Sequence, residues 1–210
     1  MVTDFVRYAD DSQIYVASRR AGERVMQSIT SFIEQHLKLG VNAEKSALAP
    51  ALERTFLGFR FYRGRDETVK IGVAPEALRR VRERLRRLTS RTWGVSMQWR
   101  IKQINRFIVG WTAYFYIANP TKTFLRLDSW LRRRLRQIRW KEWKRPKTRY
   151  RSLRALGTPE QDARKWARSK KGYWRISRAA TLHTALPNSY WQDTVGLKGF
   201  TETRHRLRER

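Results

Sequence analysis

The stretch FVRYADDSQIYVAS, residues 5–18, places two short apolar segments on either side of a pair of adjacent carboxylates. The β-branched and aromatic residues of both segments favour extended strands, and Ala-Asp-Asp-Ser has the composition of a tight turn. The stretch therefore predicts a hairpin with Asp10 and Asp11 at its tip. Because the whole chain holds only 18 acidic residues, two of them side by side at one turn need an explanation.

The sequence that follows the hairpin is a mixture of helix and strand patterns. Apolar residues at helical spacing predict a helix over 21–39, with Gly40 as its C-terminal stop. Residues 54–63 are expected to form one strand with Gly58 inside it, and residues 68–73 to form the strand that returns beside it. The first part of the chain is therefore predicted to be α+β.

The remainder of the chain is helical in pattern and strongly basic. Apolar residues repeat along one face of three successive segments, and the short connections between them predict a compact helical bundle. These segments are residues 75–91, 96–116 and 121–143. Shorter helices are expected near residues 159–169 and 178–186, and the last ten residues are expected to be frayed.

These changes of pattern predict three regions in a chain of 210 residues. Residues 1–73 form the α+β part, residues 74–145 the helical bundle, and residues 146–210 a basic helical extension. A chain of this length with 40% hydrophobic residues can bury a core, so we expect a folded protein and not one disordered throughout.

The charge balance of the chain points to a polyanionic partner. The 47 Lys and Arg residues exceed the 18 Asp and Glu residues by a formal net charge of +29. Such an excess opposes compaction unless a partner neutralises it. Nucleic acid is the favoured polyanion, and an anionic membrane surface or a ribosome-like assembly are the alternatives.

Arginines gather on two of the predicted helices at a density that solubility alone does not require. Such runs usually form a solvated face, but guanidinium groups also suit phosphates, and interleaved aromatic rings can stack on unpaired bases. The tryptophans between these arginines are Trp93, Trp99, Trp140 and Trp143. Taken individually, each is expected to be a core or anchor residue. The arginines of the predicted helix 121–143 are expected to point mostly outward. The residues predicted to contact RNA are Arg79, Arg80, Arg86, Arg87, Arg132, Arg133, Arg136 and Arg139.

Other residue types exclude several classes of site and location. Cysteine is absent, which excludes disulfides and thiolate zinc sites and fits a reducing compartment. The histidines, His36, His183 and His205, lie far apart without metal-ligand spacing, so each is expected to be a surface or half-buried residue. No signal peptide is apparent, and the longest apolar run, residues 107–118, is too short to span a bilayer. We therefore expect a cytoplasmic protein without a membrane partner.

Asp10 and Asp11 allow two interpretations from the residues alone. Asp and Ser are good turn formers, so the pair could serve only the turn. Adjacent carboxylates at a hairpin tip also suit Mg²⁺, which prefers oxygen ligands, and two such ions can activate a hydroxyl and stabilise a leaving pyrophosphate. The sequence contains no Walker loop, no spaced Ser/His/Asp set and no His/Cys cluster that would favour another chemistry.

Four motifs occur in order along the chain: YADD (8–11), GVNAEKSAL (40–48), FLGFRF (56–61) and the segment 88–119, followed by LPNSYWQDTVGLKGF (186–200). Together they resemble the group II intron reverse transcriptases, or maturases, of the bacterial type that lacks an endonuclease domain. The first three are similar to that family's catalytic hairpin, to the segment that places a lysine near the nucleotide, and to the strand that opens the primer grip. The last two are similar to its maturase-specific thumb and its C-terminal end.

The resemblance implies a fold and an activity. The fold would be the C-terminal part of a reverse-transcriptase palm followed by an α-helical, maturase-specific thumb domain. The activity would be RNA-directed DNA synthesis with Mg²⁺ on an RNA template and a DNA primer. The family also binds group II intron RNA and assists its splicing, so intron RNA is the expected partner.

The resemblance also implies roles for individual residues. Asp10 and Asp11 would be catalytic residues and metal ligands. Without the resemblance, Lys45 would be interpreted as a solvated lysine on a loop, and Gly58 as a bulge or weak point in a strand. The residues expected on the nucleotide and primer side are Tyr8, Ala9, Lys45, Leu57 and Gly58.

The sequence departs from the family pattern before the hairpin. The family has fingers and the first half of the palm there, including a strand with another catalytic Asp, whereas this sequence starts four residues before Phe5. We therefore expect the C-terminal portion of such a protein, from a truncated gene, a split gene or a fragment, and no polymerase activity from this chain alone. The missing N-terminal half or a second copy of the chain would complete it. Two alternatives stay open: a non-enzymatic RNA-binding module with a relic hairpin, and a structural, ribosome-associated protein.

Overall fold

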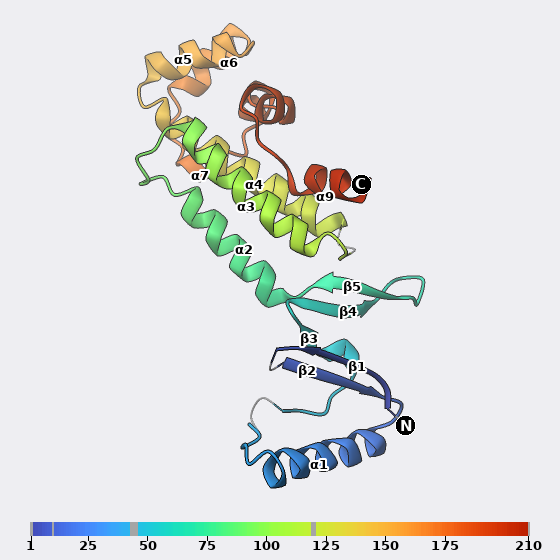
Figure 1. The fold of residues 1–210 in the computed structure, drawn as a ribbon. Helices are drawn as coiled ribbons and strands as arrows, with labels where there is room; N and C mark the ends of the chain where they lie inside the picture. Colours follow the sequence, from blue (N-terminus) through green and yellow to red (C-terminus); the bar gives the residue numbers. More distant parts are fainter. Residues whose placement is uncertain (1, 10, 43–45, 119–120, 210) are drawn as a thin grey trace. The chain divides into compact units, whose positions relative to one another are not determined.

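The computed structural model describes residues 2–9, 11–42, 46–118 and 121–209. The chain divides into two compact units, Met1–Ala74 and Pro75–Arg210. The strands lie in the first unit and the second is helical (Figure 1). This mixture confirms the α+β class predicted from the sequence, whereas the assignment to a reverse-transcriptase palm stays a prediction.

The first unit begins with the hairpin that the sequence predicts. Strand β1 (Val2–Tyr8) pairs antiparallel with β2 (Asp11–Val16) in a two-stranded sheet. Helix α1 (Arg19–Gln35) follows, because the hydroxyl of Ser18 caps its first turn by accepting a backbone hydrogen bond. A short 3₁₀ turn, η1 (Ala51–Glu53), leads into the second sheet.

A three-stranded antiparallel sheet completes the first unit. Its strands, in order, are β3 (Thr55–Phe56), β4 (Phe59–Arg63) and β5 (Val69–Val73). The expectation of one continuous strand across this region is wrong, because Leu57 and Gly58 form a two-residue turn between β3 and β4. Both have positive φ, 50° and 79°, which a type I′ hairpin turn requires and which glycine adopts at little cost.

The first unit buries little apolar surface. Among its described residues, the buried ones are Ala21, Gly22, Gly72, Val73 and Ala74. Large apolar side chains that stay exposed include Phe5, Tyr8, Phe32, Leu37, Leu39 and Val69. Because buried apolar area is the main favourable term in folding, this unit has little free energy to hold its tertiary structure.

Three long helices form the centre of the second unit, as the sequence predicts. They are α2 (Pro75–Leu88), α3 (Met97–Phe115) and α4 (Thr121–Glu142). Their apolar residues recur three and four positions apart and so form one stripe on each helix. The nearly inaccessible core residues on these stripes include Val81, Leu85, Ile101, Ile104, Ile108, Leu127, Leu131, Leu135 and Ile138.

Shorter helices surround this bundle. They are α5 (Pro146–Ala155), α6 (Glu160–Ala167), α7 (Tyr173–Ile176), α8 (Ala180–Ala185), the π turn η2 (Tyr190–Thr194) and α9 (Phe200–Arg208). The sequence predicts α6 and α8 but misses α5, where Pro146 at the first helical turn supplies the fixed backbone angle that suits a helix start.

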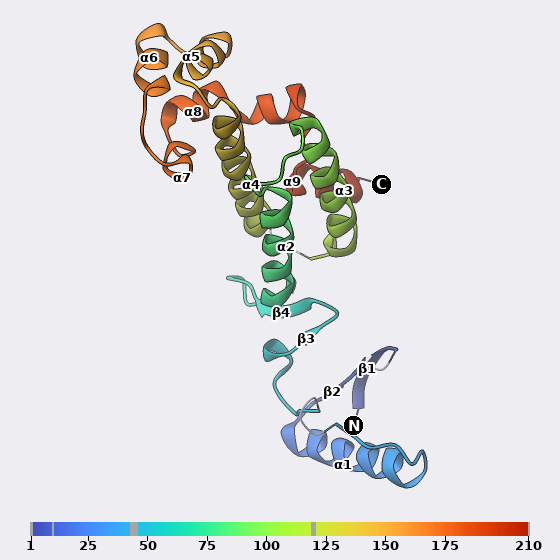
Figure 2. The same ribbon diagram turned by 90° about the vertical axis from the view of Figure 1, so that its left-hand side faces the viewer.

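The C-terminal tail is a packed helix, so the expectation that it is frayed is wrong. Helix α9 lies beside α3 and α4 (Figures 1 and 2). Phe200 is fully buried, and its ring centroid lies 5.5 Å from that of Trp111. Asn105 of α3 donates a hydrogen bond to the Gly196 carbonyl and accepts one from the Lys198 N–H. The region predicted as an extension after residue 145 thus belongs to the same compact unit as the long helices.

Candidate nucleic-acid interface

Of the carboxylate pair that the sequence singles out, the structure describes Asp11, which lies at the start of β2. Tyr8 ends β1 with 64% of its surface exposed, and the exposed Asp11 begins β2 opposite it. Ala9 has a φ of 53°, a left-handed conformation that costs roughly 1–2 kcal/mol for a residue with a Cβ atom. Asp10 and Lys45, predicted for catalysis and for the nucleotide side, lie outside the described residues.

A Mg²⁺ site requires several oxygen ligands at one point. Within the described ranges, no group of three or more His, Cys, Asp or Glu side chains is placed to hold a metal ion. Asp11 is the one predicted metal ligand whose position is described, and it is exposed to solvent. The described residues therefore do not form a two-metal site by themselves.

Two of the predicted nucleotide- and primer-side residues, Leu57 and Gly58, lie in the second sheet of the first unit. Leu57 and Gly58 are half-buried in the turn between β3 and β4. Gln13 of β2 reaches this sheet, because its Nε2 donates to the Thr55 carbonyl at 3.1 Å. The predicted catalytic hairpin and the predicted primer-side turn therefore belong to strands that contact each other.

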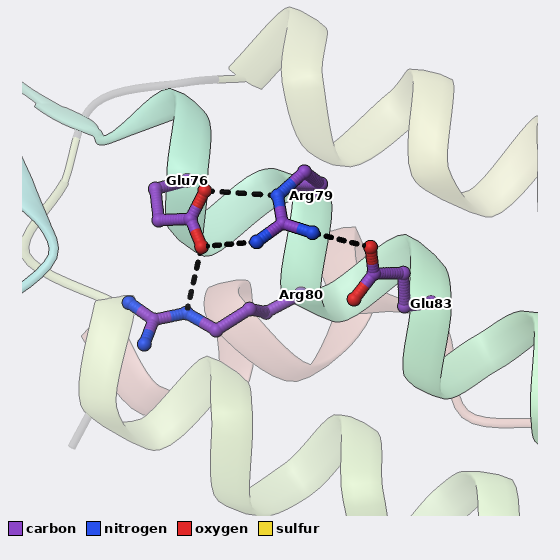
Figure 3. Close-up of polar contacts among 4 residues, drawn as sticks. All are labelled: Glu76, Arg79, Arg80 and Glu83. Carbon is purple, nitrogen blue, oxygen red and sulfur yellow. Dashed lines mark hydrogen bonds and ion pairs between the residues drawn. The ribbon is translucent and has the colours of Figure 1, made fainter.

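Carboxylates of α2 already engage two of the predicted RNA-contacting arginines (Figure 3). Arg79 donates to Glu76 from Nε and Nη2, at 2.9 and 2.6 Å, and to Glu83 from Nη1 at 2.6 Å. Arg80 lies 4.0 Å from the Glu76 carboxylate. The hydrogen bond from Arg79 lowers the pKa of Glu76. Glu76 and Glu83 thus offset part of the positive charge of Arg79 and Arg80.

The second half of α2 carries arginines without such partners. Arg82, Arg84, Arg86 and Arg87 are exposed, and none of them forms an ion pair with a carboxylate in the part of the chain that the structure describes. Arg86 instead lies over the ring of Trp130, 5.9 Å from its centroid. Uncompensated positive charge is therefore concentrated toward the C-terminal end of α2.

Arg136 on α4 is buried, so the expectation that it points outward is wrong. It is 4% exposed, and its guanidinium donates to the carbonyls of Ser177 and Leu186, both at 3.4 Å. Burial, and then the charges of Arg132 and Arg133, lower its pKa to about 10. The turns near α7 and α8 cover this face of α4, a long-range contact that the spacing within the helix does not reveal.

The other predicted arginines of α4 are half-buried. Arg133 lies 3.6 Å from the ring centroid of Trp174 and donates to the Trp174 carbonyl at 3.2 Å. Arg139 pairs with Glu142 at 2.9 Å. Burial also lowers the pKa of Arg132. Internal contacts thus occupy much of this row, and the exposed guanidinium groups of α2 are better placed to meet a phosphate backbone.

The tryptophans between the arginine runs separate into core and surface residues. Trp140 and Trp143 are buried and meet edge to face, which confirms their expected place in the core. Trp93 is half-buried, with the guanidinium of Arg100 5.0 Å from its ring centroid. Trp99 on α3 is 47% exposed, so of these four rings it is the one most open to stacking on a base.

Three basic residues that the sequence analysis did not select lie together beside Arg86. Arg91, Arg134 and Lys141 line one pocket with it, although they come from a loop and from two turns of α4. Each belongs to a basic stretch in which nothing local separates it from its neighbours. Their shared position depends on how α2 packs against α4, so no signal in the sequence could have selected them.

The arginine-bearing helices coincide with a known domain. Residues 78–157 match the family model of the group II intron, maturase-specific domain. This maturase-specific region contains most of α2 and all of α3, α4 and α5. The match confirms the resemblance of the segment 88–119 to that domain and implies a role in group II intron splicing. No curated protein matches the chain.

The match leaves the two ends of the chain outside the maturase-specific region. The first unit, with the β1–β2 hairpin, precedes it, and α6 to α9 follow it. None of the described helices is long and apolar enough to cross a membrane.

Proposed function

We propose that the second unit binds the structured RNA of a group II intron and so assists its splicing. The proposal rests on the exposed arginines of α2 that have no described carboxylate partner, which lie inside the maturase-specific region. These residues, Arg82, Arg84, Arg86 and Arg87, are called the arginine row below. Exposed guanidinium groups can form paired hydrogen bonds with phosphates, and their charges attract RNA from a distance. The net charge of +29 supports the same partner, because RNA supplies the anions that the chain lacks.

Salt dependence of RNA binding tests this proposal. Each phosphate contact releases condensed counterions, so log K should fall against log salt by about 0.7–0.9 per contact. Binding of a structured intron RNA, measured by filter retention between about 50 and 300 mM salt, should therefore weaken steeply. An affinity that is flat across this range would contradict binding through the arginine row.

A matched pair of variants on α2 localises the contact. Arg84→Gln/Arg87→Gln removes two exposed arginines without described carboxylate partners, and should lower the salt slope by about 1–2 as well as the affinity. Arg79→Gln/Arg80→Gln removes the same charge from the turns that hold Glu76 and Glu83, and should have a smaller effect. Equal slopes in both double variants would show that the row at the end of α2 is not the contact.

The predicted contacts from α4 need a different design. Arg132, Arg133 and Arg136 are all predicted to contact RNA, but Arg136 is buried and hydrogen-bonded, so the three cannot be neutralised together without affecting the core. That triple variant would disturb folding as well as RNA contact. Arg133→Gln alone, with thermal unfolding measured beside RNA affinity, separates the two effects, because an RNA contact changes affinity at unchanged stability.

We further propose that the hairpin of the first unit contributes Asp10 and Asp11 to an RNA-directed DNA polymerase that uses Mg²⁺. The support is the resemblance of the YADD motif and the exposed position of Asp11 at the end of the β1–β2 ladder. The alternative is an RNA-binding module whose hairpin has no catalytic role. Both share the RNA-binding second unit, so only the hairpin variants distinguish them.

Primer extension on an RNA template with Mg²⁺ tests the polymerase proposal. We expect no extension by this chain alone, and extension once a partner supplies the additional carboxylates of a two-metal site. Asp10→Asn and Asp11→Asn should each abolish that extension and leave RNA affinity unchanged within about twofold, since they remove no positive charge. Extension by the chain alone that disappears in Asp10→Asn would contradict the need for a partner.

A further inference from the structure

A pocket of about 430 Å³ opens beside the last turn of α2. Three parts of the second unit form its wall: the end of α2, the loop that leads to α3, and the second half of α4. The lining residues are Arg86, Ser90, Arg91, Thr92, Arg134, Gln137 and Lys141.

The lining of this pocket is cationic without a compensating acid. It combines three guanidinium groups and one ammonium group with two hydroxyls and one amide, and none of the lining residues is Asp or Glu. The pKa of Arg134 is lowered, first by burial and then by the charges of Arg86 and Arg91. An anion in the pocket would relieve this repulsion, so the site favours a negatively charged occupant.

Hydrogen bonds hold the pocket in place before any ligand arrives. Arg134 donates from Nε to the Thr89 hydroxyl at 2.5 Å and from Nη2 to the Thr89 and Arg86 carbonyls at 3.3 and 3.4 Å. Lys141 donates from Nζ to the Arg91 carbonyl. The side chains of Arg134 and Lys141 are thus held by the bundle itself, and a ligand would not have to order these two.

The loop that supplies three of the lining residues is fixed by a buried guanidinium. Arg100, 1% exposed, donates to the carbonyls of Leu88, Ser90 and Trp93 at 2.6, 3.1 and 2.8 Å. The two carbonyl acceptors in the loop flank Arg91 and Thr92. The hydrogen bonds from Arg100 therefore hold this part of the pocket wall in a defined conformation.

We propose that this pocket binds a phosphate group. A phosphate offers three acceptor oxygens and up to two negative charges, which suits several guanidinium forks better than a single carboxylate does. The phosphate can come from an RNA backbone or from a free phosphate or phosphate terminus. Only the first source rests on the proposed function; the pocket's preference for phosphate does not.

Binding of inorganic phosphate tests the pocket directly. All nine tryptophans lie in the second unit, so intrinsic fluorescence follows the thermal unfolding of that unit alone. Replacing chloride by phosphate at constant ionic strength should raise the unfolding temperature of the wild type. If the unfolding temperature is the same in chloride and in phosphate, the inference is overturned, because the anion would then act only by general screening of charge.

Variants inside and outside the pocket locate the phosphate. Arg91→Gln/Lys141→Gln removes two charges from the lining and should weaken phosphate binding at least ~tenfold. Lys147→Gln/Arg151→Gln removes two charges from exposed positions on α5 and should leave it within about twofold. If the first variant does not fold, the single variant Arg86→Gln replaces it, because Arg86 is exposed and forms no described ion pair. An equal phosphate response in pocket and control variants overturns the inference.

RNA arms of the same experiment identify the source of the phosphate. If inorganic phosphate competes with RNA in the wild type but not in the pocket variant, the occupant is a backbone phosphate. If a short RNA with a 5′-phosphate binds more tightly than its 5′-hydroxyl twin only when the pocket is intact, the occupant is a terminal phosphate. Steeply salt-dependent RNA binding without a pocket-specific phosphate response overturns this inference alone. A pocket-specific phosphate response without RNA binding supports it and contradicts the proposed function.

Discussion

At the scale of single residues, Arg100 connects the end of α2 to the loop before α3 through its buried side chain. Its buried guanidinium donates to three backbone carbonyls between α2 and α3. Arg100→Ala leaves those carbonyls without partners and opens a cavity, so we expect a loss of about 3 kcal/mol in the free energy of unfolding. Urea unfolding followed by tryptophan fluorescence measures it. Arg106→Ala, at an exposed position of the same helix, should cost less than about 0.5 kcal/mol.

His183 on α8 should give the second unit a pH dependence. Burial and the charge of Arg136 lower its pKa, outweighing a hydrogen bond to the Ser177 backbone that raises it. The unfolded chain therefore takes up the proton at a higher pH than the folded one, so stability falls as pH drops below about 6.5. The unfolding temperature should decrease between about pH 7.5 and pH 5.5, and His183→Gln should reduce this decrease.

A second histidine provides the control for this pH effect. His205 is exposed on α9, and His205→Gln, measured in parallel, shows how the loss of an imidazole elsewhere in the same unit changes the unfolding temperature. A dependence that persists unchanged in His183→Gln would assign the effect to other groups.

At the scale of elements, the position of α9 depends on one carboxylate of α4. The buried Asp128 accepts hydrogen bonds from the backbone N–H groups of Phe200 and Thr201 at 2.8 and 3.1 Å, and from the Thr201 hydroxyl at 2.7 Å. A carboxylate there also complements the positive end of the helix dipole. The N-cap residue of α9, Gly199, has no side chain that could cap the helix. Asp128 of α4 caps α9 in its place.

Removing this cap should release α9 from the bundle. We expect Asp128→Ala to destabilise the second unit by about 2 kcal/mol and to increase hydrogen exchange in α9 more than in α3. Asp193→Ala, at an exposed position, is the matched control and should change neither quantity measurably. Unchanged exchange of the α9 amides in Asp128→Ala would show that the aromatic contacts of Phe200 suffice to hold the helix.

At the scale of the whole molecule, the two units should differ in stability. The described residues of the first unit bury almost no large apolar side chain, whereas the stripes of α2, α3 and α4 are nearly inaccessible. Amide exchange should therefore be faster in 2–16 and 55–73 than in 97–115 and 121–142, because local opening costs less where little area is buried. Slower exchange in the strands than in α3 and α4 would contradict this expectation.

The sequence by itself determined the elements whose signals are local. β-Branched, aromatic and turn residues predicted the β1–β2 hairpin, and the three- and four-residue spacing of apolar side chains predicted α2, α3 and α4. The turn at Leu57-Gly58 could also have been predicted from the sequence, because a glycine inside a strand pattern suits a tight hairpin turn. Local periodicity predicts such elements because helix and strand place side chains at fixed intervals.

Only the tertiary structure decided which basic residues are buried, which are paired and which share a pocket. Arg136 and Arg100 lie inside because helix faces and loops distant in sequence cover them, and the last helix is ordered because Asp128 and Trp111 contact it. The phosphate pocket likewise needs α2 and α4 side by side. Composition determines the net charge of +29, from which a polyanionic partner is predicted. The positions of those charges depend on packing between residues far apart in the chain.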